Sequence, residues 1–216
     1  MSNIKFVMLD FDGTTADTTP SIIYCAEKVC LEEGYTLDRE LLARNTGFTT
    51  EAAFEFLTGS TDPVLINRMT ESYKRHYDNE GLDMITLFDG VLETMELLHS
   101  KGIKFAVTTN NVSPVIEAMT KRLGMAKYLD NIVCLDNVSA GKPAPDIAIE
   151  SMRRAGCTPE ESIVVGDSTF DMGMGCNAGC RCLGVTYGSH SSETLLNGGA
   201  TWVVDSFRDI AKIILE

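Results

Sequence analysis

Residues 9–14 read Leu-Asp-Phe-Asp-Gly-Thr, at the end of the apolar run Ile4–Leu9. The run predicts a short buried strand, and Gly13 lets the backbone turn sharply after it. Side chains two residues apart on an extended segment point the same way, so Asp10 and Asp12 are expected to face one pocket. In open α/β sheets, chemistry gathers beyond the carboxyl ends of the strands. Two carboxylates so close are costly unless a cation lies between them or one takes a proton, and both outcomes indicate function.

The same pattern also suits a simple turn, because Asp and Gly are favoured in turns. It further matches the start of an EF-hand calcium loop, which requires a Glu at its twelfth position. Counted from Asp10, that position is Ser21, so the calcium loop is excluded. The choice between a turn and a catalytic site therefore depends on the rest of the chain.

Length and composition indicate an ordered protein with a substantial core. The chain has 216 residues, 44% of them hydrophobic and 23% charged, with no low-complexity tract. This size permits one large domain or two small ones. No apolar run approaches the roughly 18 residues that span a bilayer, and the N-terminus lacks the basic head and apolar middle of a signal peptide. We therefore expect a cytoplasmic protein.

The formal net charge of −13 bears on possible partners. Such a field repels nucleic acid and anionic membranes, and we expect neither as a partner. A phosphorylated substrate would be repelled as well, so binding one would need a local positive group such as a metal or a well-placed Lys. Either a monomer or a homodimer is compatible with the sequence.

Cysteine and histidine spacing gives little support for a metal cluster built from these residues. None of the seven cysteines forms a Cys-x-x-Cys pair, and Cys180 and Cys182 with Cys176 upstream are the closest group. Reduced, mostly buried thiols are the expected state. The histidines at 76, 99 and 190 are widely scattered, and we expect them to be structural or on the surface.

Strand-like and helical stretches alternate along most of the chain. The expected strands are 4–9, 103–109, 131–135, 162–165, 181–185 and 202–204. Between the later strands, helices are expected at 90–101, 112–124, 144–156, 169–179 and 206–215. This alternation predicts the α/β class, with a mostly parallel, Rossmann-like sheet flanked by helices on both faces.

The first connection between strands is far too long for an ordinary crossover. About 90 residues separate the first two strands, and they hold helical patterns at 20–34, 37–45, 49–58 and 62–79. Pro20 suits a helix start, and Asp62-Pro63 reads as a cap followed by the first helical residue. We therefore predict a helical domain over residues 15–83, inserted into a core made of 1–14 and 84–216. It would serve either as a mobile lid over the acid pocket or as a rigid helical layer.

Three later strand ends carry polar residues as well. Thr109 and Asn110 precede a helix that Ser113 and Pro114 should open, a setting that suits phosphate binding as well as a simple cap. Lys142 stands between Gly and Pro just before another helix, where it could neutralise phosphate charge or be an ordinary surface Lys. Asp167 and Asp171 close the set. Asp167 could join Asp10 as a magnesium ligand or cap the next helix.

Taken in order, Asp10-Phe-Asp12-Gly-Thr14, Thr109-Asn110, Lys142-Pro143 and Gly166-Asp167-Ser168-x-x-Asp171 resemble the four motifs of the haloacid dehalogenase superfamily. The resemblance spans the whole chain and puts each motif at a strand end. The helical insert and its entry Asp17-Thr18-Thr19-Pro20 resemble the phosphoglycolate phosphatase-like branch, which has a small α-helical cap. The resemblance implies a phosphoric monoester hydrolase with this fold.

The resemblance also implies roles for individual residues. Asp10 would be the nucleophile that becomes an aspartyl phosphate, and Asp12 the general acid and base. Mg²⁺ would bind the Asp10 carboxylate, the Asp12 carbonyl and the Asp167 carboxylate. The transferring phosphate would be held by Thr109, Asn110 and Lys142. Two supporting residues complete the set: Thr14 for the loop geometry, and Asp171 to orient Lys142 or a metal-bound water.

Comparison with other branches of the superfamily narrows the class of reaction. It does not identify the substrate. Its dehalogenases lack an acid at the position of Asp12, and the surroundings of Lys28 do not support the Schiff base of the phosphonate hydrolases. β-Phosphoglucomutases carry a His early in the cap, where residues 21–25 have none. A small phosphate ester is therefore the expected substrate: phosphoglycolate, a sugar phosphate, a nucleotide or pyrophosphate. A phosphosugar mutase and a silent binding module remain as alternatives.

Substrate choice is expected to lie in the cap. Residues 44–48, Arg-Asn-Thr-Gly-Phe, resemble the specificity loop of this branch, in which a Gly usually stands. Gly47 would take that place, and Arg44 would either reach a substrate anion or remain solvated at a helix end.

Overall fold

The computed structural model describes residues 3–39, 42 and 49–216, and the chain divides into two compact units. The first unit comprises residues 1–16 and 87–216, and the second comprises residues 17–86. The chain passes between the units through two short strands, β2 (Ala16–Asp17) and β3 (Thr86–Leu87), which pair in a two-stranded sheet.

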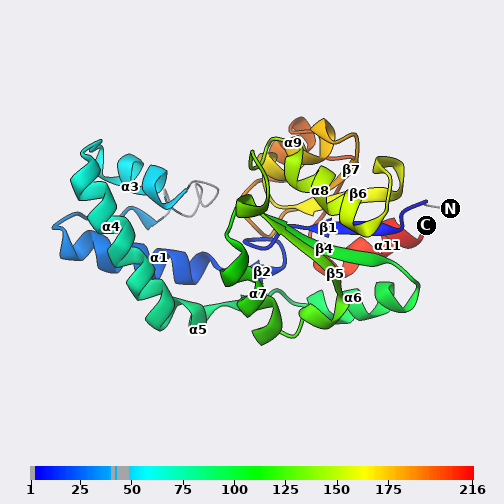
Figure 1. The fold of residues 1–216 in the computed structure, drawn as a ribbon, viewed down its shortest axis with the longest axis horizontal. Helices are drawn as coiled ribbons and strands as arrows, with labels where there is room; N and C mark the ends of the chain where they lie inside the picture. Colours follow the sequence, from blue (N-terminus) through cyan, green and yellow to red (C-terminus); the bar gives the residue numbers. More distant parts are fainter. Residues whose placement is uncertain (1–2, 40–41, 43–48) are drawn as a thin grey trace. The chain divides into compact units, whose positions relative to one another are not determined.

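The first unit is built on a six-stranded parallel sheet (Figure 1). In spatial order the strands are β5 (Leu129–Cys134), β4 (Lys104–Thr109), β1 (Phe6–Leu9), β6 (Ser162–Gly166), β7 (Arg181–Val185) and β8 (Trp202–Val204). All their pairings are parallel. The predicted fold class is therefore confirmed. Strand β1, Phe-Val-Met-Leu, is apolar and buried along its whole length, as expected of a parallel strand covered on both faces.

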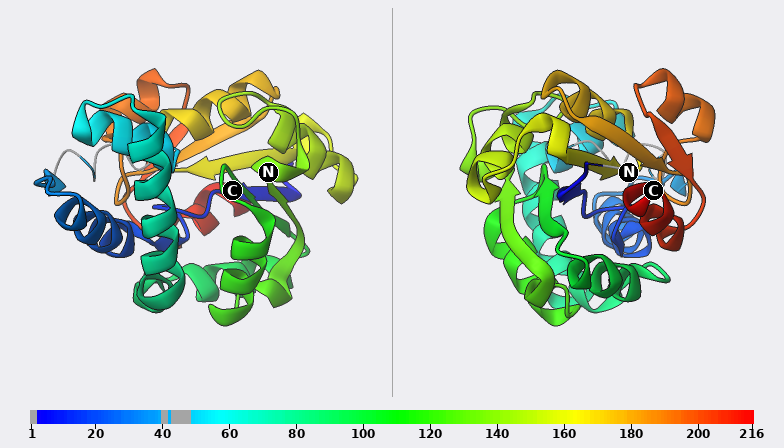
Figure 2. Two further views of the ribbon diagram at one scale, coloured as in Figure 1. Left: turned by 60° about the vertical axis from the view of Figure 1, so that its left-hand side comes forward. Right: turned by 90° about the vertical axis from the view of Figure 1, so that its right-hand side faces the viewer.

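Helices lie on both faces of this sheet (Figures 1 and 2). On one face α8 (Asp146–Ala155), α9 (Thr169–Asn177) and α10 (Ser192–Asn197) pack on a core that includes Phe6, Met8 and Val164. The other face is covered by α6 (Val91–Ser100), α7 (Ser113–Arg122) and α11 (Ile210–Leu215). Short 3-10 turns complete the unit at Ala126–Tyr128, Leu135–Asn137, Pro159–Glu161 and Phe207–Asp209.

The second unit is helical. It contains α1 (Thr19–Glu32), α3 (Thr50–Thr58), α4 (Pro63–His76), the π-helical turn η1 (Tyr77–Gly81) and α5 (Leu82–Met84). Its own small core includes Val29, Phe54 and Met69. As predicted, Asp62 caps α4: its side chain accepts a hydrogen bond from Val64 N–H at 3.0 Å, and Pro63 follows at the first helical position.

Most element boundaries lie within about two residues of the predicted ones, and the exceptions have simple causes. Strands β2 and β3 and helix α10 escaped prediction because two to six residues carry too little periodicity. The helical pattern at 62–79 continues into the π turn, so its helix ends earlier than expected. The helix expected at 37–45 falls largely outside the described residues. Among the described residues, no helix has the length and apolar character that crossing a membrane requires.

Candidate active site

The order of the strands explains why distant polar residues meet. Because β4 and β6 flank β1 on either side, the segments that follow these three strands leave the sheet next to one another. Those segments carry Asp10 after β1, Thr109 at the end of β4, and Asp167 after β6. The Asp10 N–H still donates to Val165 O of β6 at 2.9 Å, so the loop of residues 10–15, predicted from the sequence to be the nucleophile loop, begins in register with the sheet.

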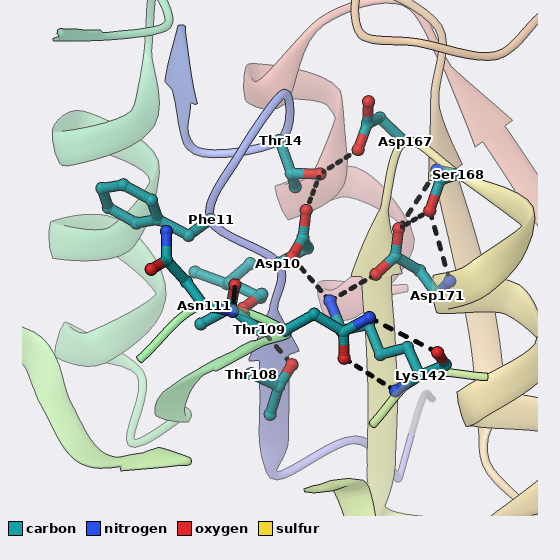
Figure 3. A network of polar contacts seen from close by, with 12 residues as sticks. Asp10, Phe11, Thr14, Thr108, Thr109, Asn111, Lys142, Asp167, Ser168 and Asp171 are labelled. Atoms are coloured by element: carbon teal, nitrogen blue, oxygen red, sulfur yellow. Dashed lines mark hydrogen bonds and ion pairs between the residues drawn. The ribbon is translucent and has the colours of Figure 1, made fainter. Parts of the chain in front are cut away.

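Three carboxylates converge at this edge of the sheet (Figure 3). Asp10, Asp167 and Asp171 are all buried, and one oxygen from each lies within 4.8 Å of the others. The hydroxyl of Thr14 lies between two of them: it is 3.1 Å from Asp167 Oδ1 and 3.4 Å from Asp10 Oδ2. The structure thus places the acids of the first and last motifs within reach of a shared ion.

Lys142 supplies the positive charge of the site. Its Nζ donates to Asp10 Oδ1 at 2.5 Å and to Asp171 Oδ1 at 2.6 Å, and its side chain is only 4% exposed. The backbone of Lys142 is held by the side-chain amide of Asn110, which accepts from Lys142 N–H at 2.8 Å and donates to the carbonyl at 3.4 Å. Asn110 therefore holds the lysine loop against the end of β4, and the following peptide bond to Pro143 is cis.

Asp171 is oriented by the start of helix α9. Ser168 is the N-cap and forms a capping box: its N–H donates to Asp171 Oδ2 at 3.1 Å, and its Oγ accepts from Asp171 N–H at 3.4 Å. The Ser168 hydroxyl also donates to Asp171 Oδ2 at 2.6 Å. The other oxygen of Asp171 is then directed at Lys142 Nζ. Capping by Asp167, the alternative considered from the sequence, does not occur because Ser168 takes that position.

Among the residues that the structure describes, the carboxylates of the site outnumber the positive charge of Lys142. Burial raises the pKa of Asp10 well above its usual range; Lys142 opposes this shift, while the charges of Asp171, Asp167 and Asp12 add to it. Burial also raises the pKa of Asp167, followed by the charge of Asp171. Burial alone would lower the pKa of Lys142, but Asp10 and Asp171 outweigh it and raise that pKa, so the ammonium stays charged.

This excess of buried negative charge fits a divalent cation. Carboxylate oxygens are the ligands that Mg²⁺ prefers, and a cation beside Asp10 would favour its ionised, nucleophilic form. The backbone at Gly13 approaches one of these acids closely. A Cβ on Gly13, whose φ is +80°, would lie 2.4 Å from Asp167 Oδ2. Because a side chain would collide with Asp167, only Gly fits at this turn.

The remaining residues predicted from the sequence to be functional lie in different settings. Asp12 is half-buried and forms an isolated bridge with Ala16. The Thr109 hydroxyl accepts from Asn111 N–H at 3.1 Å, which turns the chain towards α7. Arg44 and Gly47 lie outside the described residues.

Two parts of the site were not anticipated from the sequence. Ser168 could have been found, because Ser followed three residues later by an acid before a helical pattern is typical of a capping box. The loop that follows β7 also reaches the acids: Ser189 N–H donates to Asp167 Oδ2 at 2.7 Å. Its position after a strand at the same edge of the sheet is a signal that could have indicated it.

Thiols and imidazoles take no part in the acid cluster. All seven cysteines are free thiols, and the sulfurs of Cys176 and Cys182 lie 4.0 Å apart. The three histidines make structural contacts: His76 with Glu32, His99 with the Tyr128 ring, and His190, whose Nδ1 accepts from Thr169 N–H at 3.1 Å.

The fold and this arrangement of acids and lysine define a hydrolase of the haloacid dehalogenase type, and comparison with known proteins places the chain in that family. Residues 7–185 match the haloacid dehalogenase-like hydrolases, so the chain belongs to this family. The chain is 28% identical over 232 residues to a phosphoglycolate phosphatase of Salmonella paratyphi A, covering 97% of this chain and 92% of the relative. It is also 29% identical over 153 residues to the pyrophosphatase PpaX of Halalkalibacterium halodurans, with 71% of each chain covered.

A solved structure supports the same assignment. A Bacteroides fragilis protein assigned to the haloacid dehalogenase-like hydrolases superposes with a TM-score of 0.89 at 26% identity, covering 96% of this chain and 99% of the other. The predicted family, fold class and enzyme class, a phosphatase of the haloacid dehalogenase type, are thereby confirmed.

Proposed function

We propose that the chain is a magnesium-dependent phosphatase that hydrolyses a small phosphomonoester through an aspartyl phosphate on Asp10. The observation that carries the proposal is the buried contact of Lys142 Nζ with Asp10 and Asp171, beside Asp167. A carboxylate nucleophile splits one difficult displacement into two easier ones. The relatives named phosphoglycolate phosphatase and pyrophosphatase support a phosphate ester as the substrate.

In the first step an oxygen of the Asp10 carboxylate attacks phosphorus, and the bond from phosphorus to the leaving oxygen breaks. Asp12 donates its proton to that oxygen, so the leaving group departs as an alcohol. In the second step Asp12 takes a proton from water as the water attacks phosphorus. The bond from phosphorus to Asp10 then breaks, which frees the carboxylate and releases phosphate.

The remaining residues hold the reacting groups. Lys142 fixes the position of the Asp10 carboxylate and, with Thr109, holds the phosphoryl oxygens. Its own ammonium is held in place by Asp171. We assign the metal to the carboxylates of Asp10 and Asp167 and the carbonyl of Asp12. When bound, Mg²⁺ would offset the repulsion between the nucleophile and the phosphoryl oxygens.

We also propose that residues 15–83 act as a cap that selects the substrate. The proposal is supported by the place of the insertion: β2, which leads into the helices, directly follows the loop of residues 10–15 in the sequence, and β3, which leads out of them, pairs with β2. Arg44 and Gly47 remain candidates for contacts that determine specificity.

The test is release of phosphate from p-nitrophenyl phosphate with MgCl₂ and with EDTA, followed by a panel containing phosphoglycolate, pyrophosphate, sugar phosphates and nucleoside monophosphates. We expect turnover that requires Mg²⁺ and is lost in Asp10→Asn. Isomerisation of a hexose phosphate without release of free phosphate would favour the mutase. No turnover with any ester would favour the silent binding module.

A further inference from the structure

The loop after β7 contacts both segments that carry the catalytic acids. Three consecutive contacts join it to them: Tyr187 Oη donates to Thr14 O at 2.7 Å, Ser189 N–H to Asp167 Oδ2 at 2.7 Å, and His190 N–H to Asp167 O at 3.1 Å. Between them, a Cβ on Gly188 would lie 2.4 Å from the Cβ of Asp167. The loop therefore packs directly against Asp167 while its tyrosine reaches the nucleophile loop.

Tyr187 is itself held firmly. Its ring lies against Phe88, with the ring centroids 4.5 Å apart. The backbone N–H of Phe88 donates to Thr15 O at 3.1 Å, so two adjacent carbonyls of the nucleophile loop are each held by one member of this aromatic pair. Burial raises the pKa of Tyr187, so its hydroxyl stays protonated and acts as a donor.

The carbonyl that Tyr187 holds belongs to the residue that lies between the acids. The Thr14 hydroxyl is within hydrogen-bond distance of Asp167 Oδ1 and Asp10 Oδ2, and a hydroxyl has a single proton to donate. Its placement between two carboxylates therefore depends on where the Thr14 backbone lies. Within the nucleophile loop, Thr15 N–H and Ala16 N–H both donate to Phe11 O, and neither bond fixes the Thr14 carbonyl.

We propose that Tyr187 is a positioning residue of the active site: by holding the Thr14 carbonyl it fixes the Thr14 hydroxyl between Asp10 and Asp167. The inference rests on the proposed phosphatase activity for its kinetic consequence, but the tie itself is independent of activity. Tyr187 touches no reacting atom and acts only through Thr14.

The experiment compares Tyr187→Phe with Tyr128→Phe, a matched loss of a phenol hydroxyl from a buried ring far along the chain in the same unit. With p-nitrophenyl phosphate and MgCl₂, we expect kcat of Tyr187→Phe to fall about tenfold, as for loss of one well-placed hydrogen bond, with KM changed less than about twofold. Tyr128→Phe should keep both constants. Amide hydrogen exchange in the peptide covering residues 10–16 should be faster only in Tyr187→Phe.

A double-mutant cycle separates positioning from general support. Thr14→Val removes the hydroxyl while keeping the shape. If Tyr187 acts through that hydroxyl, Tyr187→Phe should lower kcat no further when it is added to Thr14→Val. The inference would be overturned if the two substitutions had multiplicative effects on kcat. It would also be overturned if amide hydrogen exchange in Tyr187→Phe became faster to the same degree throughout the unit. Wild-type protein without turnover would refute the proposed function, and exchange in residues 10–16 would still decide whether the tie exists.

Discussion

Two lysine–carboxylate clusters in this protein use the same chemistry in opposite surroundings. In the first unit, Lys142 contacts Asp10 and Asp171 with side chains that are 4%, 11% and 1% exposed. In the helical unit, Lys28 donates to Glu80 at 2.8 and 3.1 Å, with side chains that are 37% and 42% exposed. The difference teaches that burial, more than the identity of the pair, decides what such a cluster can do.

The two clusters also differ in how their charges balance. Lys28 and Tyr24 both donate to Glu80, and these bonds lower the pKa of Glu80 to about 2, as expected of an acid whose charge is satisfied. The buried cluster sets three acids against one lysine, and the pKa values of Asp10 and Asp167 rise instead. An exposed balanced pair contributes little, whereas a buried unbalanced one needs either a cation or a bound proton to offset its charge.

The largest expected effect comes from removing the proposed nucleophile. Asp10→Asn should lower kcat for p-nitrophenyl phosphate by at least about 10³-fold, because an amide cannot form the covalent intermediate. The fold should survive, since Asn relieves repulsion from Asp167 and Asp171. Glu80→Gln, the corresponding change in the exposed cluster, should retain activity. An Asp10→Asn enzyme within tenfold of wild type would rule out the assigned nucleophile.

Removing the lysine should lower the free energy of unfolding much more in the buried cluster than in the exposed one. Lys142→Met leaves buried carboxylates without their counter-charge, and breaking a buried pair in this way costs about 3 kcal/mol or more in the free energy of unfolding. Lys28→Met should barely change the urea midpoint, because water solvates Glu80. Urea denaturation of both variants at neutral pH measures the contrast. Equal shifts would mean that burial does not distinguish the clusters.

Magnesium should stabilise only the buried cluster. At a concentration about 100-fold above its dissociation constant, a ligand of the native state adds about 2.7 kcal/mol to the free energy of unfolding. We therefore expect MgCl₂ to raise the Tm of the wild type by several degrees over NaCl of equal ionic strength. The rise should persist in Glu80→Gln and vanish in Asp167→Asn. An equal rise in Asp167→Asn would place the ion elsewhere.

Sequence reasoning reached the buried cluster because its members obey a positional rule. Asp10, Asp167 and Lys142 each follow a strand or precede a helix, and residues at the carboxyl ends of parallel strands share one edge of the sheet. The fold followed from the same alternation of strands and helices. The exposed cluster follows no such rule, since the meeting of Lys28 with Glu80 depends on how helix α1 packs against the π turn.

The tie from Tyr187 to Thr14 lay beyond prediction for a different reason. It is a bond from a side chain to a backbone carbonyl across 173 positions, and it leaves no trace in periodicity or residue type. Ser168 was within reach because its capping box is a local pattern that spans four residues, 168–171. Contacts that follow from a local sequence pattern, within one element or at one strand end, can be predicted. Contacts that form only when loops pack together cannot.

The smallest expected effect is on the pH dependence of stability. The contributions of Glu80 and Asp167 to the free energy of unfolding should change with pH in opposite directions, which tests the comparison of the two clusters most directly. The lowered pKa of Glu80 means that its contribution to stability is fully present above the usual value of 4.5 and is lost as the pH falls towards about 2. The raised pKa of Asp167 means the reverse: its contribution is fully present below 3.8 and is lost as the pH rises through the higher folded value. In EDTA, the stability deficit of Glu80→Gln should therefore shrink below pH 4.5. Asp167→Asn should gain on the wild type as the pH rises from 3.8 towards neutrality. Urea midpoints measured from pH 3 to pH 7 give both slopes, and solvent screening keeps the Glu80 slope small.

Glu150→Gln is the matched control. The pKa of Glu150 is also lowered to about 2, by Arg153 and Arg154, yet this residue lies in the first unit. If the urea midpoint of Glu150→Gln changes with pH as that of Glu80→Gln does, the exposure of the acid sets the sign of the slope. If it changes as that of Asp167→Asn does, the unit in which the acid lies sets the sign.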